Sequence, residues 1–440
     1  VHYPPQSVIK EFIKVLKELK VEFGGLFKFW LGPDLNVVVS NPDDVKLLLT
    51  NSKTSVKGPQ YKYMADVLGG GLLSGSGPTW RKHRKLINPN FGKRAIESYG
   101  EVFNKEVDDL LKKFRSMGSR EQFNVYTHVV RTTSYAVCQT LMGLTKEQTL
   151  KIPHIEKVID DSPSMYDIVF RRMTKWYLQI DPVFWVSSKY YALKNFMKIM
   201  TEFSQRIVLN RTESLKTLGL EGSERDRLMN AEDHADVNTR LSVIDRFLLS
   251  QELNKEELVQ ETFTIFTTGQ EPTAKISSYI LLMMAYHPKC QEKLYAEIKS
   301  VIGDEDRNVT DDDFKQMPYL EMVFKEVLRL FPPGAALQRT ITEDITISTH
   351  TLPAGCSLVV PAYHLHRDPR FWSDPDHFDP ERFNSENVKK CNHNCYIPFS
   401  LGPMDCIGKL LIFVLTLHLQ HVSEMRSYNT TILTPPKCMG

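Results

Sequence analysis

The sequence of 440 residues predicts a mainly α-helical protein with a minor β component. Apolar residues recur at helical spacing through most of the middle of the chain, and short β-like runs are clearest near residues 26–39 and 341–361. No internal repeat or low-complexity linker interrupts it. The composition, with 42% hydrophobic and 25% charged residues, is that of a globular protein. We therefore expect one domain over residues 1–440.

The N-terminal region predicts two helices separated by two strands. Apolar residues of Val8–Phe23 fall at helical spacing, and two glycines then end the helix. Leu26–Leu31 and residues 36–39 have strand character and flank a Gly-Pro-Asp turn. Asn41 is the expected N-cap of the next helix, since Pro42 suits the first helical position.

Helical patterns then dominate from about Trp80 to Lys299. The clearest cover residues 103–114, 127–142, 192–217, 243–248 and 256–286. Residues 218–238 are charged, contain glycine and have few large apolar side chains, which predicts an exposed loop. Two more helices are expected at 288–302 and 319–330, followed by β-like runs at 341–348 and 357–361.

Charge and cysteine content exclude some classes of protein. The formal net charge of +2 gives no strongly basic field, so we expect no nucleic-acid partner. Seven cysteines are too few for a disulfide scaffold, which favours a reducing compartment. The most apolar stretches, 279–286 and 410–417, are shorter than the roughly 20 residues that cross a bilayer. We therefore expect that either the protein is soluble or an anchor precedes this sequence, and the start at Val1 rather than Met favours a trimmed chain.

The most informative segment for chemistry is residues 398–408, Pro-Phe-Ser-Leu-Gly-Pro-Met-Asp-Cys-Ile-Gly. It presents a lone cysteine, Cys406, just before an apolar helical run that begins at Lys409. A thiolate at a helix N-terminus is stabilised by the helix dipole and by free N–H groups. Cys406 could therefore be a nucleophile, a redox thiol or a metal ligand, and the alternative is a buried, inert cysteine.

Three further motifs contain charged residues. In Phe-Lys-Glu-Val-Leu-Arg (324–329), Glu326 and Arg329 share one helix face and can pair, although such spacing usually means a surface ion pair. Arg382, in Pro-Glu-Arg-Phe (380–383), could complete a network with them. Trp80 and Arg84 lie one turn apart in Trp-Arg-Lys-His-Arg (80–84).

Taken together, in this order and at these separations, the motifs resemble those of the cytochrome P450 family of haem-thiolate monooxygenases. W-x-x-x-R occurs at 80–84, E-x-x-R at 326–329, P-E-R-F at 380–383 and F-x-x-G-x-x-x-C-x-G at 399–408. The resemblance extends from about residue 25 to 408. Residues 68–74, Leu-Gly-Gly-Gly-Leu-Leu-Ser, and the segment Val-Gln-Glu-Thr-Phe-Thr-Ile-Phe that starts at 259 are most similar to the family-4 group, and we expect an insect member. The resemblance implies the cytochrome P450 fold, with haem between the long oxygen-activating helix and the cysteine-loop helix.

The resemblance also implies a role for each matching residue. Cys406 would be the axial thiolate ligand of the iron in haem (heme b), with Phe399 packed beside its sulfur. Trp80, Arg84 and Arg339 would bind the haem propionates, because a cation offsets the desolvation of a buried carboxylate. Residues 326, 329 and 382 would form a structural triad that supports folding rather than turnover.

The oxygen-activating helix departs from the family pattern A/E-G-x-D/E-T-T, since residues 268–273 are Thr-Gly-Gln-Glu-Pro-Thr. Glu271 keeps the acid, but Pro272 replaces the threonine whose hydroxyl assists proton transfer. Thr273 supplies the next hydroxyl, yet at 3.6 residues per turn it points about 100° away unless a bulge or a water compensates. Glu271 and Thr273 are therefore the candidate catalytic residues, and we expect slow or uncoupled oxygenation. Pro272 is expected to deepen the helix groove rather than break the fold.

Other departures concern the cofactor and the end of the chain. Thr268 stands where many family-4 members have a glutamate that esterifies the haem, so we expect non-covalent haem. Met404 replaces an arginine that reaches a propionate, which should weaken haem retention. Ile412 and Leu415 replace the Ala and Glu of the usual A-x-x-E, and residues 423–440 lack the expected strand pattern, so 409–440 is atypical.

The resemblance implies an enzyme that inserts one atom of O₂ into a lipophilic substrate such as a fatty acid, odorant, hormone or xenobiotic. Electrons would come from an NADPH-dependent cytochrome P450 reductase, with cytochrome b5 as a further candidate donor. His83 and Lys82 could give a basic docking face for the reductase, although a solvated face is the usual meaning of such residues. Peripheral or anchored association with the cytosolic face of the endoplasmic reticulum membrane is expected.

Two alternative functions remain open at this stage. Pro272 favours a haem-thiolate isomerase or dehydratase, which rearranges peroxides and needs no proton relay. Met404 and the atypical tail favour a catalytically impaired haem or lipid binder. Consumption of NADPH with a reductase distinguishes the monooxygenase from both alternatives.

Overall fold

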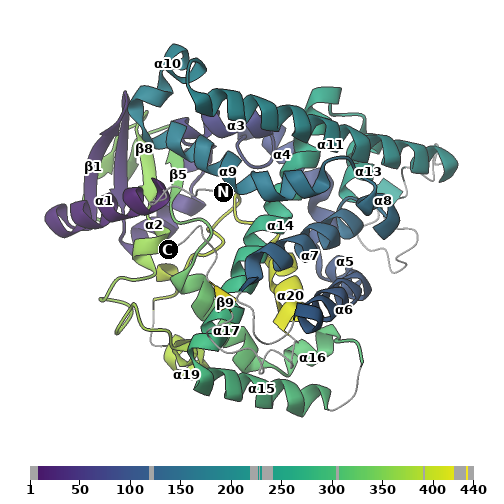
Figure 1. The fold of residues 1–440 in the computed structure, drawn as a ribbon. Coiled ribbons are helices and arrows are strands. Elements are labelled where there is room, and N and C mark those ends of the chain that lie inside the picture. Colours follow the sequence, from purple (N-terminus) through teal and green to yellow (C-terminus); the bar gives the residue numbers. More distant parts are fainter. Residues whose placement is uncertain are drawn as a thin grey trace.

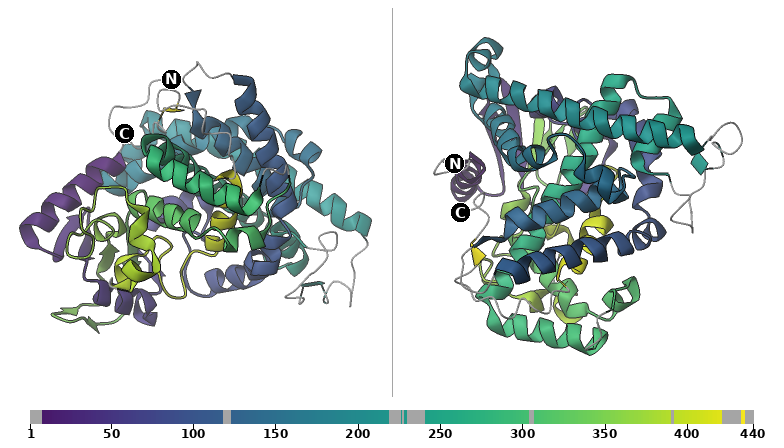
Figure 2. Two further views of the ribbon diagram at one scale, coloured as in Figure 1. Left: turned by 90° about the horizontal axis from the view of Figure 1, so that it is seen from below. Right: turned by 45° about the vertical axis from the view of Figure 1, so that its right-hand side comes forward.

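The computed structural model describes residues 8–117, 123–218, 226, 228–229, 241–303, 307–389, 392–420 and 433–434. Within these ranges helices predominate, which confirms the predicted mainly α class with minor β structure (Figure 1). The principal sheet lies at one edge of the molecule beside the first two helices, and the helices form the rest (Figures 1 and 2).

The principal sheet has five strands in the described part of the chain, in the order β1-β2-β8-β5-β3. Only the β2–β8 pair is parallel among these neighbours. Two small sheets, β4-β9 and β6-β7, complete the β structure. The strands are β1 (Leu26–Leu31), β2 (Asp34–Val39), β3 (Val56–Lys57), β4 (Phe123–Asn124), β5 (Leu337–Thr340), β6 (Ile345–Thr346), β7 (Thr351–Leu352), β8 (Ser357–Val360) and β9 (Leu433–Thr434).

Each predicted periodic segment corresponds to a helix, and the structure adds helices that were not singled out from sequence, among them Ile155–Thr174. Their bounds are α1 (Val8–Phe23), α2 (Pro42–Thr50), α3 (Lys62–Leu68), α4 (Gly77–Ile87), α5 (Lys93–Glu97), α6 (Gly100–Met117), α7 (Val125–Thr140), α8 (Lys146–Leu150), α9 (Ile155–Thr174), α10 (Asp181–Trp185), α11 (Ser188–Leu218), α13 (Val243–Ser250), α14 (Lys255–Tyr286), α15 (Pro288–Ile302), α16 (Asp311–Lys315), α17 (Pro318–Leu330), α18 (Ala362–Leu365), α19 (Ser385–Val388) and α20 (Lys409–Gln420). The predicted N-cap of α2 is confirmed, because the Asn41 side chain accepts hydrogen bonds from the N–H groups of Asp43 and Asp44.

Three predicted segments differ from the structure or lie partly outside its described residues. The strand predicted at 341–348 is displaced toward the N-terminus. The longer strand β5 ends at Thr340, and 341–348 contains only the two-residue strand β6. Most of the predicted loop at 218–238 lies outside the described residues. The tail, predicted to lack strand structure, contains β9, which pairs in parallel with β4, while residues 421–432 and 435–440 lie outside the described part.

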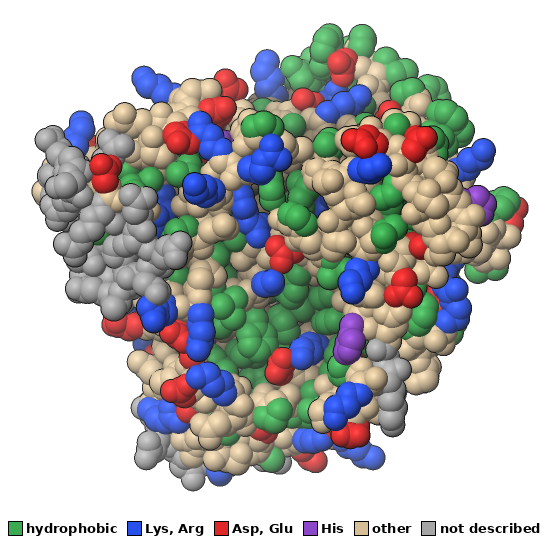
Figure 3. Space-filling model, turned by 180° about the vertical axis from the view of Figure 1, so that it is seen from behind, with side chains coloured by type: hydrophobic (Ala, Val, Ile, Leu, Met, Phe, Trp, Pro, Cys, Tyr) green, Lys and Arg blue, Asp and Glu red, His purple; other side chains and the backbone are tan. Residues whose placement is uncertain are grey.

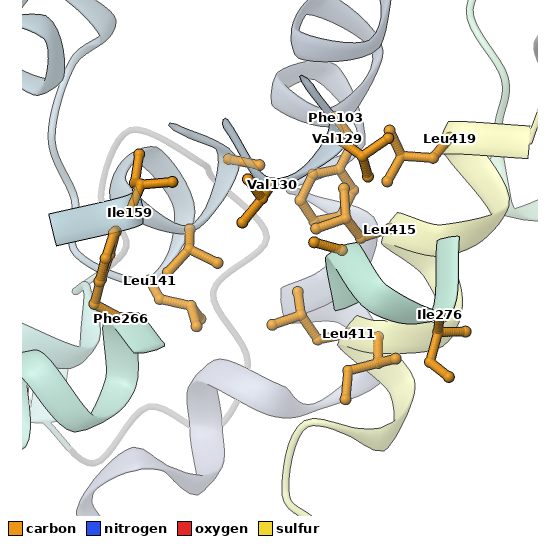
Figure 4. Close-up of a cluster of buried hydrophobic side chains, with 14 of the residues drawn as sticks. Phe103, Val129, Val130, Leu141, Ile159, Phe266, Ile276, Leu411, Leu415 and Leu419 are labelled. Carbon is orange, nitrogen blue, oxygen red and sulfur yellow. The ribbon is translucent and has the colours of Figure 1, made fainter. Parts of the chain in front are cut away.

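Helix α14 is the centre of the helical core. It packs against α7, α11, α17 and α20, so apolar residues occur on several of its faces rather than on one stripe. Figure 4 shows side chains of this core from α6, α7, α9, α14 and α20, among them Phe103, Val129, Ile159, Phe266 and Leu415. The long helix is thereby fixed on most sides and can hold its side chains rigidly.

A buried ionic network connects α17 to the irregular segment that follows the sheet. Glu326 and Arg329 are fully buried and form two hydrogen bonds of 2.7 and 2.8 Å. Arg329 also donates to the carbonyl oxygens of His366, Pro375 and His377, and the Arg382 Nε lies 3.5 Å from Glu326. The predicted network of these three charged residues is therefore present in the fold.

Replacing Arg329 with methionine should destabilise the protein by about 3–5 kcal/mol, because Glu326 would keep a buried charge without a partner. That is a large part of the typical 5–15 kcal/mol stability of a domain. The measurement is the free energy of unfolding in urea. The double variant R329M/E326Q, which removes both charges, should be less destabilised, and Lys105→Met at the exposed Lys105–Glu101 pair should have little effect. Equal losses for R329M and K105M would contradict this prediction.

His366 lies fully buried beside this network. Its Nε2 accepts a hydrogen bond from the N–H of Ile397 at 2.9 Å, which requires the neutral ring. Burial, and then the nearby charges of Arg329 and Arg367, lower the pKa of His366 from 6.5 to about 3. The protonated ring is therefore strongly disfavoured in the folded protein.

This lowered pKa predicts loss of stability in mild acid. The unfolded chain binds the His366 proton near pH 6.5 and the folded chain only near pH 3, so the stabilisation present above pH 6.5 is lost as the pH falls. From pH 6.5 to 5 the loss should be about 2 kcal/mol. Unfolding free energies of His366→Gln should show a shallower acid slope than those of the parent protein. The exposed His350→Gln is the control, and identical slopes for all three proteins would rule the effect out.

Candidate active site

A cavity of about 2140 Å³ lies between α14 and the segment that leads into α20, and α1, α4, α9, β3 and β5 contribute to its walls. Seen from behind (Figure 3), the molecule has a hollow with hydrophobic side chains in its floor and charged side chains around it. The cavity brings together six of the seven predicted site residues, namely Trp80, Arg84, Glu271, Arg339, Phe399 and Cys406. Thr273 is the exception.

The cysteine loop is shaped by two local contacts. The N–H of Cys406 donates to the carbonyl of Phe399 at 3.0 Å, which folds the loop back on itself. Gly402 has φ +76°, and a Cβ there would lie 2.4 Å from the carbonyl oxygen of Leu49, so only glycine fits. Helix α20 begins three residues after Cys406. The motif is therefore a rigid turn that holds one sulfur at the cavity wall.

Cys406 is the only cysteine among the described residues that line the cavity, and it forms no disulfide with another described cysteine. Burial raises the pKa of its thiol, while the N–H of Gly408 donates a hydrogen bond to the sulfur and acts in the opposite direction. The position of Cys406 before an apolar helix predicted the second effect, and the alternative of a buried cysteine is consistent with the first. A thiolate here needs a cation beside the sulfur, which a bound metal supplies.

The end of the cavity near β3 and β5 is strongly cationic. Lys57, Arg84 and Arg339 all line it. Arg84 donates to the carbonyl and carboxylate oxygens of Asp405 at 2.8 and 3.1 Å, and Asp405 also pairs with Lys409. Among the described residues, neither Lys57 nor Arg339 forms a carboxylate ion pair. When an anion keeps Lys57 charged, these three cations with at most one carboxylate carry a surplus of about two positive charges, which suits a dianionic group such as a haem with two propionates.

The cavity wall formed by α14 includes Glu271 but not Thr273, the other candidate catalytic residue. The helix continues through Pro272, as predicted, and Thr268, Glu271 and Pro272 line the cavity. Thr273 is fully buried outside the lining, and its hydroxyl donates to the carbonyl of Gly269 at 2.8 Å. Helix geometry thus directs this hydroxyl away from the cavity, so Thr273 is not placed for proton transfer there.

Glu271 has a partner that the sequence patterns did not indicate. Lys275 lies one turn further along α14 and also lines the cavity. Its Nζ lies 2.6 Å from a carboxylate oxygen of Glu271, whose side chain is only 5% exposed. This ion pair places two ionisable side chains of α14 on the cavity wall next to Pro272.

The suggested basic docking face is wrong for His83. This side chain is 2% exposed and its Nδ1 lies 2.7 Å from Glu261 of α14, which also accepts the N–H of Leu72 at 2.8 Å. Lys82 forms a surface ion pair with Glu252. His83 therefore joins α4 to α14 rather than facing solvent, and Glu261 also holds the backbone of Leu72.

The fold and the cavity define a haem-thiolate protein: a mainly helical chain in which a lone cysteine and a surplus of cations line one large cavity. A sequence model of the family described as Cytochrome P450 matches residues 5–413, and the chain belongs to the cytochrome P450 family. It is thus an oxidoreductase with a haem-thiolate cofactor, and membership of the family implies a haem monooxygenase. Members of this family generally use a redox partner.

Similar curated proteins come from the family-4 group, as predicted. Cytochrome P450 4V2 from Homo sapiens is 29% identical over 407 residues, which cover 91% of this chain and 76% of that protein. Cytochrome P450 4V2 from Rattus norvegicus is 30% identical over 413 residues, with the same coverage. Probable cytochrome P450 4s3 from Drosophila melanogaster is 28% identical over 406 residues, 91% of this chain and 79% of that protein. No described helix is long and apolar enough to span a bilayer.

Proposed function

We propose that the Cys406 thiolate would hold the haem iron and that the chain oxygenates a lipophilic substrate with electrons from an NADPH-dependent cytochrome P450 reductase. The observation that carries the proposal is that Cys406 and the acid-bearing face of α14 line one cavity. Haem-thiolate, when bound, supplies the activation of O₂. Cytochrome b5 is a further candidate donor.

The residues of this chain would hold, enclose and serve the cofactor. Phe399 packs at the cysteine loop, and Trp80, Arg84 and Arg339 lie at the cationic end where propionates would bind. Apolar side chains along the wall exclude water and suit a lipophilic substrate; they include Met64, Leu72, Leu73, Ile265 and Phe331. Glu271, with Lys275 as its ion-pair partner, would be the acid–base group of the cavity wall.

The first test is the carbon monoxide difference spectrum of the purified, dithionite-reduced protein. A red-shifted Soret band is expected if a thiolate binds the iron. A spectrum that contains the unshifted band alone would contradict the assignment. The second test supplies a cytochrome P450 reductase, NADPH, ¹⁸O₂ and a panel of fatty acids, odorants, hormones and xenobiotics. Incorporation of one ¹⁸O atom per product molecule supports the monooxygenase and identifies the substrate class.

Pro272 favours one second candidate, a haem-thiolate isomerase or dehydratase. The cavity wall has no hydroxyl at this position, and the hydroxyl of Thr273 is directed elsewhere. A rearrangement of a hydroperoxide needs no external protons or electrons, so it tolerates this loss. Turnover of a fatty-acid hydroperoxide without NADPH would support this candidate, whereas NADPH-dependent incorporation of ¹⁸O₂ would exclude it as the sole activity.

We also propose peripheral binding to the cytosolic face of the endoplasmic reticulum membrane. Exposed apolar residues are concentrated near α10, namely Trp176, Tyr177, Ile180, Val183, Trp185, Val186 and Tyr191. Trp30 of β1 shares a shallow groove with Trp176 and Ile180. Helix α10 lies at the upper left of Figure 1, which is the upper right of Figure 3 because that view is from behind. Hydrophobic side chains gather there in Figure 3. Exposed Trp and Tyr side chains are typical of surfaces at the membrane–water interface.

Co-sedimentation with phosphatidylcholine vesicles tests this surface. The double variant W176S/W185S should bind vesicles at least several-fold more weakly, because it removes two exposed aromatic side chains. Tyr286→Ser is the control, since Tyr286 is about as exposed but lies on α14 outside this cluster. Equal vesicle binding by all three proteins would count against the proposal.

A further inference from the structure

Two cations face each other across a pair of strands at the cationic end of the cavity. β3 and β5 are antiparallel, and Lys57 is the register partner of Arg339. Like charges directly opposite one another in a sheet are destabilising. Sequence patterns did not single out Lys57, yet it lines the same cavity as Arg84 and Arg339.

The backbone of Lys57 is fixed on both sides. Its N–H donates to the hydroxyl of Ser76 at 2.8 Å, and its carbonyl accepts from the hydroxyl of Thr340 at 3.0 Å. Its Nζ lies 5.0 Å from the centroid of the Tyr61 ring, and Arg339 donates to the hydroxyl of Tyr61. The ammonium group is therefore held at the cavity wall, and no described carboxylate pairs with it.

The electrostatic environment of Lys57 is unfavourable without an anion. Burial, and then the charges of Arg339 and Arg84, lower the pKa of Lys57 from 10.5 to about 7. An anion among these three groups would remove the repulsion and restore the charged lysine. Met404 lies in the same lining and cannot provide a positive charge, although the family pattern has arginine there.

We propose that Lys57 binds a haem propionate and supplies the cation that Met404 lacks. The proposal rests on the proposed haem orientation, with iron at Cys406 and propionates toward β3 and β5. It assigns a cofactor-binding residue to a segment outside the family motifs. It also implies that the missing arginine need not weaken haem retention, since a cation from another strand takes its place.

The test compares rates of haem transfer from the holoprotein to an excess of an apo-globin acceptor. Lys57→Met should lose haem roughly ten to a hundred times faster than the parent protein, as expected for one charge-assisted hydrogen bond in a buried site. Lys57→Arg should stay near the parent rate. Lys53→Met is the matched control, because Lys53 lies on the same segment but pairs with Glu343 outside the cavity. Unchanged transfer from Lys57→Met would overturn the proposal.

Two further measurements separate propionate binding from a merely structural role. First, adding Met404→Arg to Lys57→Met should restore slow transfer, which also keeps the test decisive if the single variant retains too little haem to measure. Second, haem dimethyl ester lacks the propionate charges, so the parent protein and the Lys57→Met variant should lose this ester at the same rate after reconstitution. A difference of the same size with the ester, or no rescue by arginine at 404, would show that Lys57 acts only on the fold.

The rates of haem transfer do not depend on which reaction the protein catalyses. If the parent protein lacks the red-shifted carbon monoxide band, the thiolate assignment fails. If the band is present and Lys57→Met retains haem as the parent does, only the lysine proposal fails. The two failures are therefore distinguishable with the same preparations.

Discussion

Replacing Cys406 with serine should abolish the red-shifted carbon monoxide band and lower the rate of product formation at least roughly a thousandfold, the scale expected when a group at the reacting centre is removed. The physical reason is that the thiolate donates electron density to the iron, which a serine hydroxyl does not match. The structure offers no substitute, since the lining contains no other described cysteine. The reduced carbon monoxide spectrum and the ¹⁸O incorporation rate are the two measurements.

Cys290→Ser is the matched control for Cys406. Cys290 lies at the start of α15, outside the cavity lining, so its replacement should leave both the band and the rate nearly unchanged. The far-ultraviolet circular dichroism of both variants should match that of the parent, because a Cys-to-Ser change at a cavity wall removes little packing. A red-shifted band that survives in C406S would transfer the ligand role to another residue and refute the assignment.

Local signals explain how much of the fold could be predicted. The bounds of α1 and α15 agree with the periodic segments from sequence, because their apolar stripes end at a glycine or a proline. The N-cap of α2 was likewise readable from Asn41 and Pro42. Strands of two residues, such as β3 and β9, have no such signal. They form because tertiary contacts bring two extended segments together.

The same difference between local sequence signals and tertiary contacts applies to the residues of the candidate active site. Cys406 and Arg84 could be found because each belongs to a spaced motif, and Arg339 because the family resemblance implies a propionate-binding residue after the E-x-x-R helix. Lys57 could not, since its importance depends on register with Arg339, a residue in a distant part of the chain. The surface role suggested for His83 failed for the same reason, because its partner Glu261 is 178 residues away. Helix geometry did indicate that the Thr273 hydroxyl would point away, and the structure agrees.

Replacing Pro272 with threonine should raise the fraction of NADPH electrons recovered in oxygenated product and reduce the release of hydrogen peroxide. A positioned proton donor typically contributes about 10²–10⁴-fold to such a step, so the gain in product formation should be at least tenfold even if Glu271 and Lys275 already assist. The site can receive the new side chain, since Pro272 itself lines the cavity and α14 is helical on both sides of it. The measurements are NADPH consumed, peroxide released and product formed per unit time.

Pro272→Val separates the hydroxyl from the backbone. Threonine and valine both restore the N–H that proline lacks, and with it a donor for the carbonyl of Thr268, so both should stabilise α14 relative to proline. Their side chains have nearly the same shape, but only threonine can donate a proton. If P272T couples better and P272V does not, the missing hydroxyl limits this enzyme. Equal gains in both would mean that the helix bend is responsible. If neither variant improves coupling and the parent protein turns over hydroperoxide, the protein catalyses a rearrangement that needs no proton delivery. Pro272 is then compatible with the reaction of the parent protein.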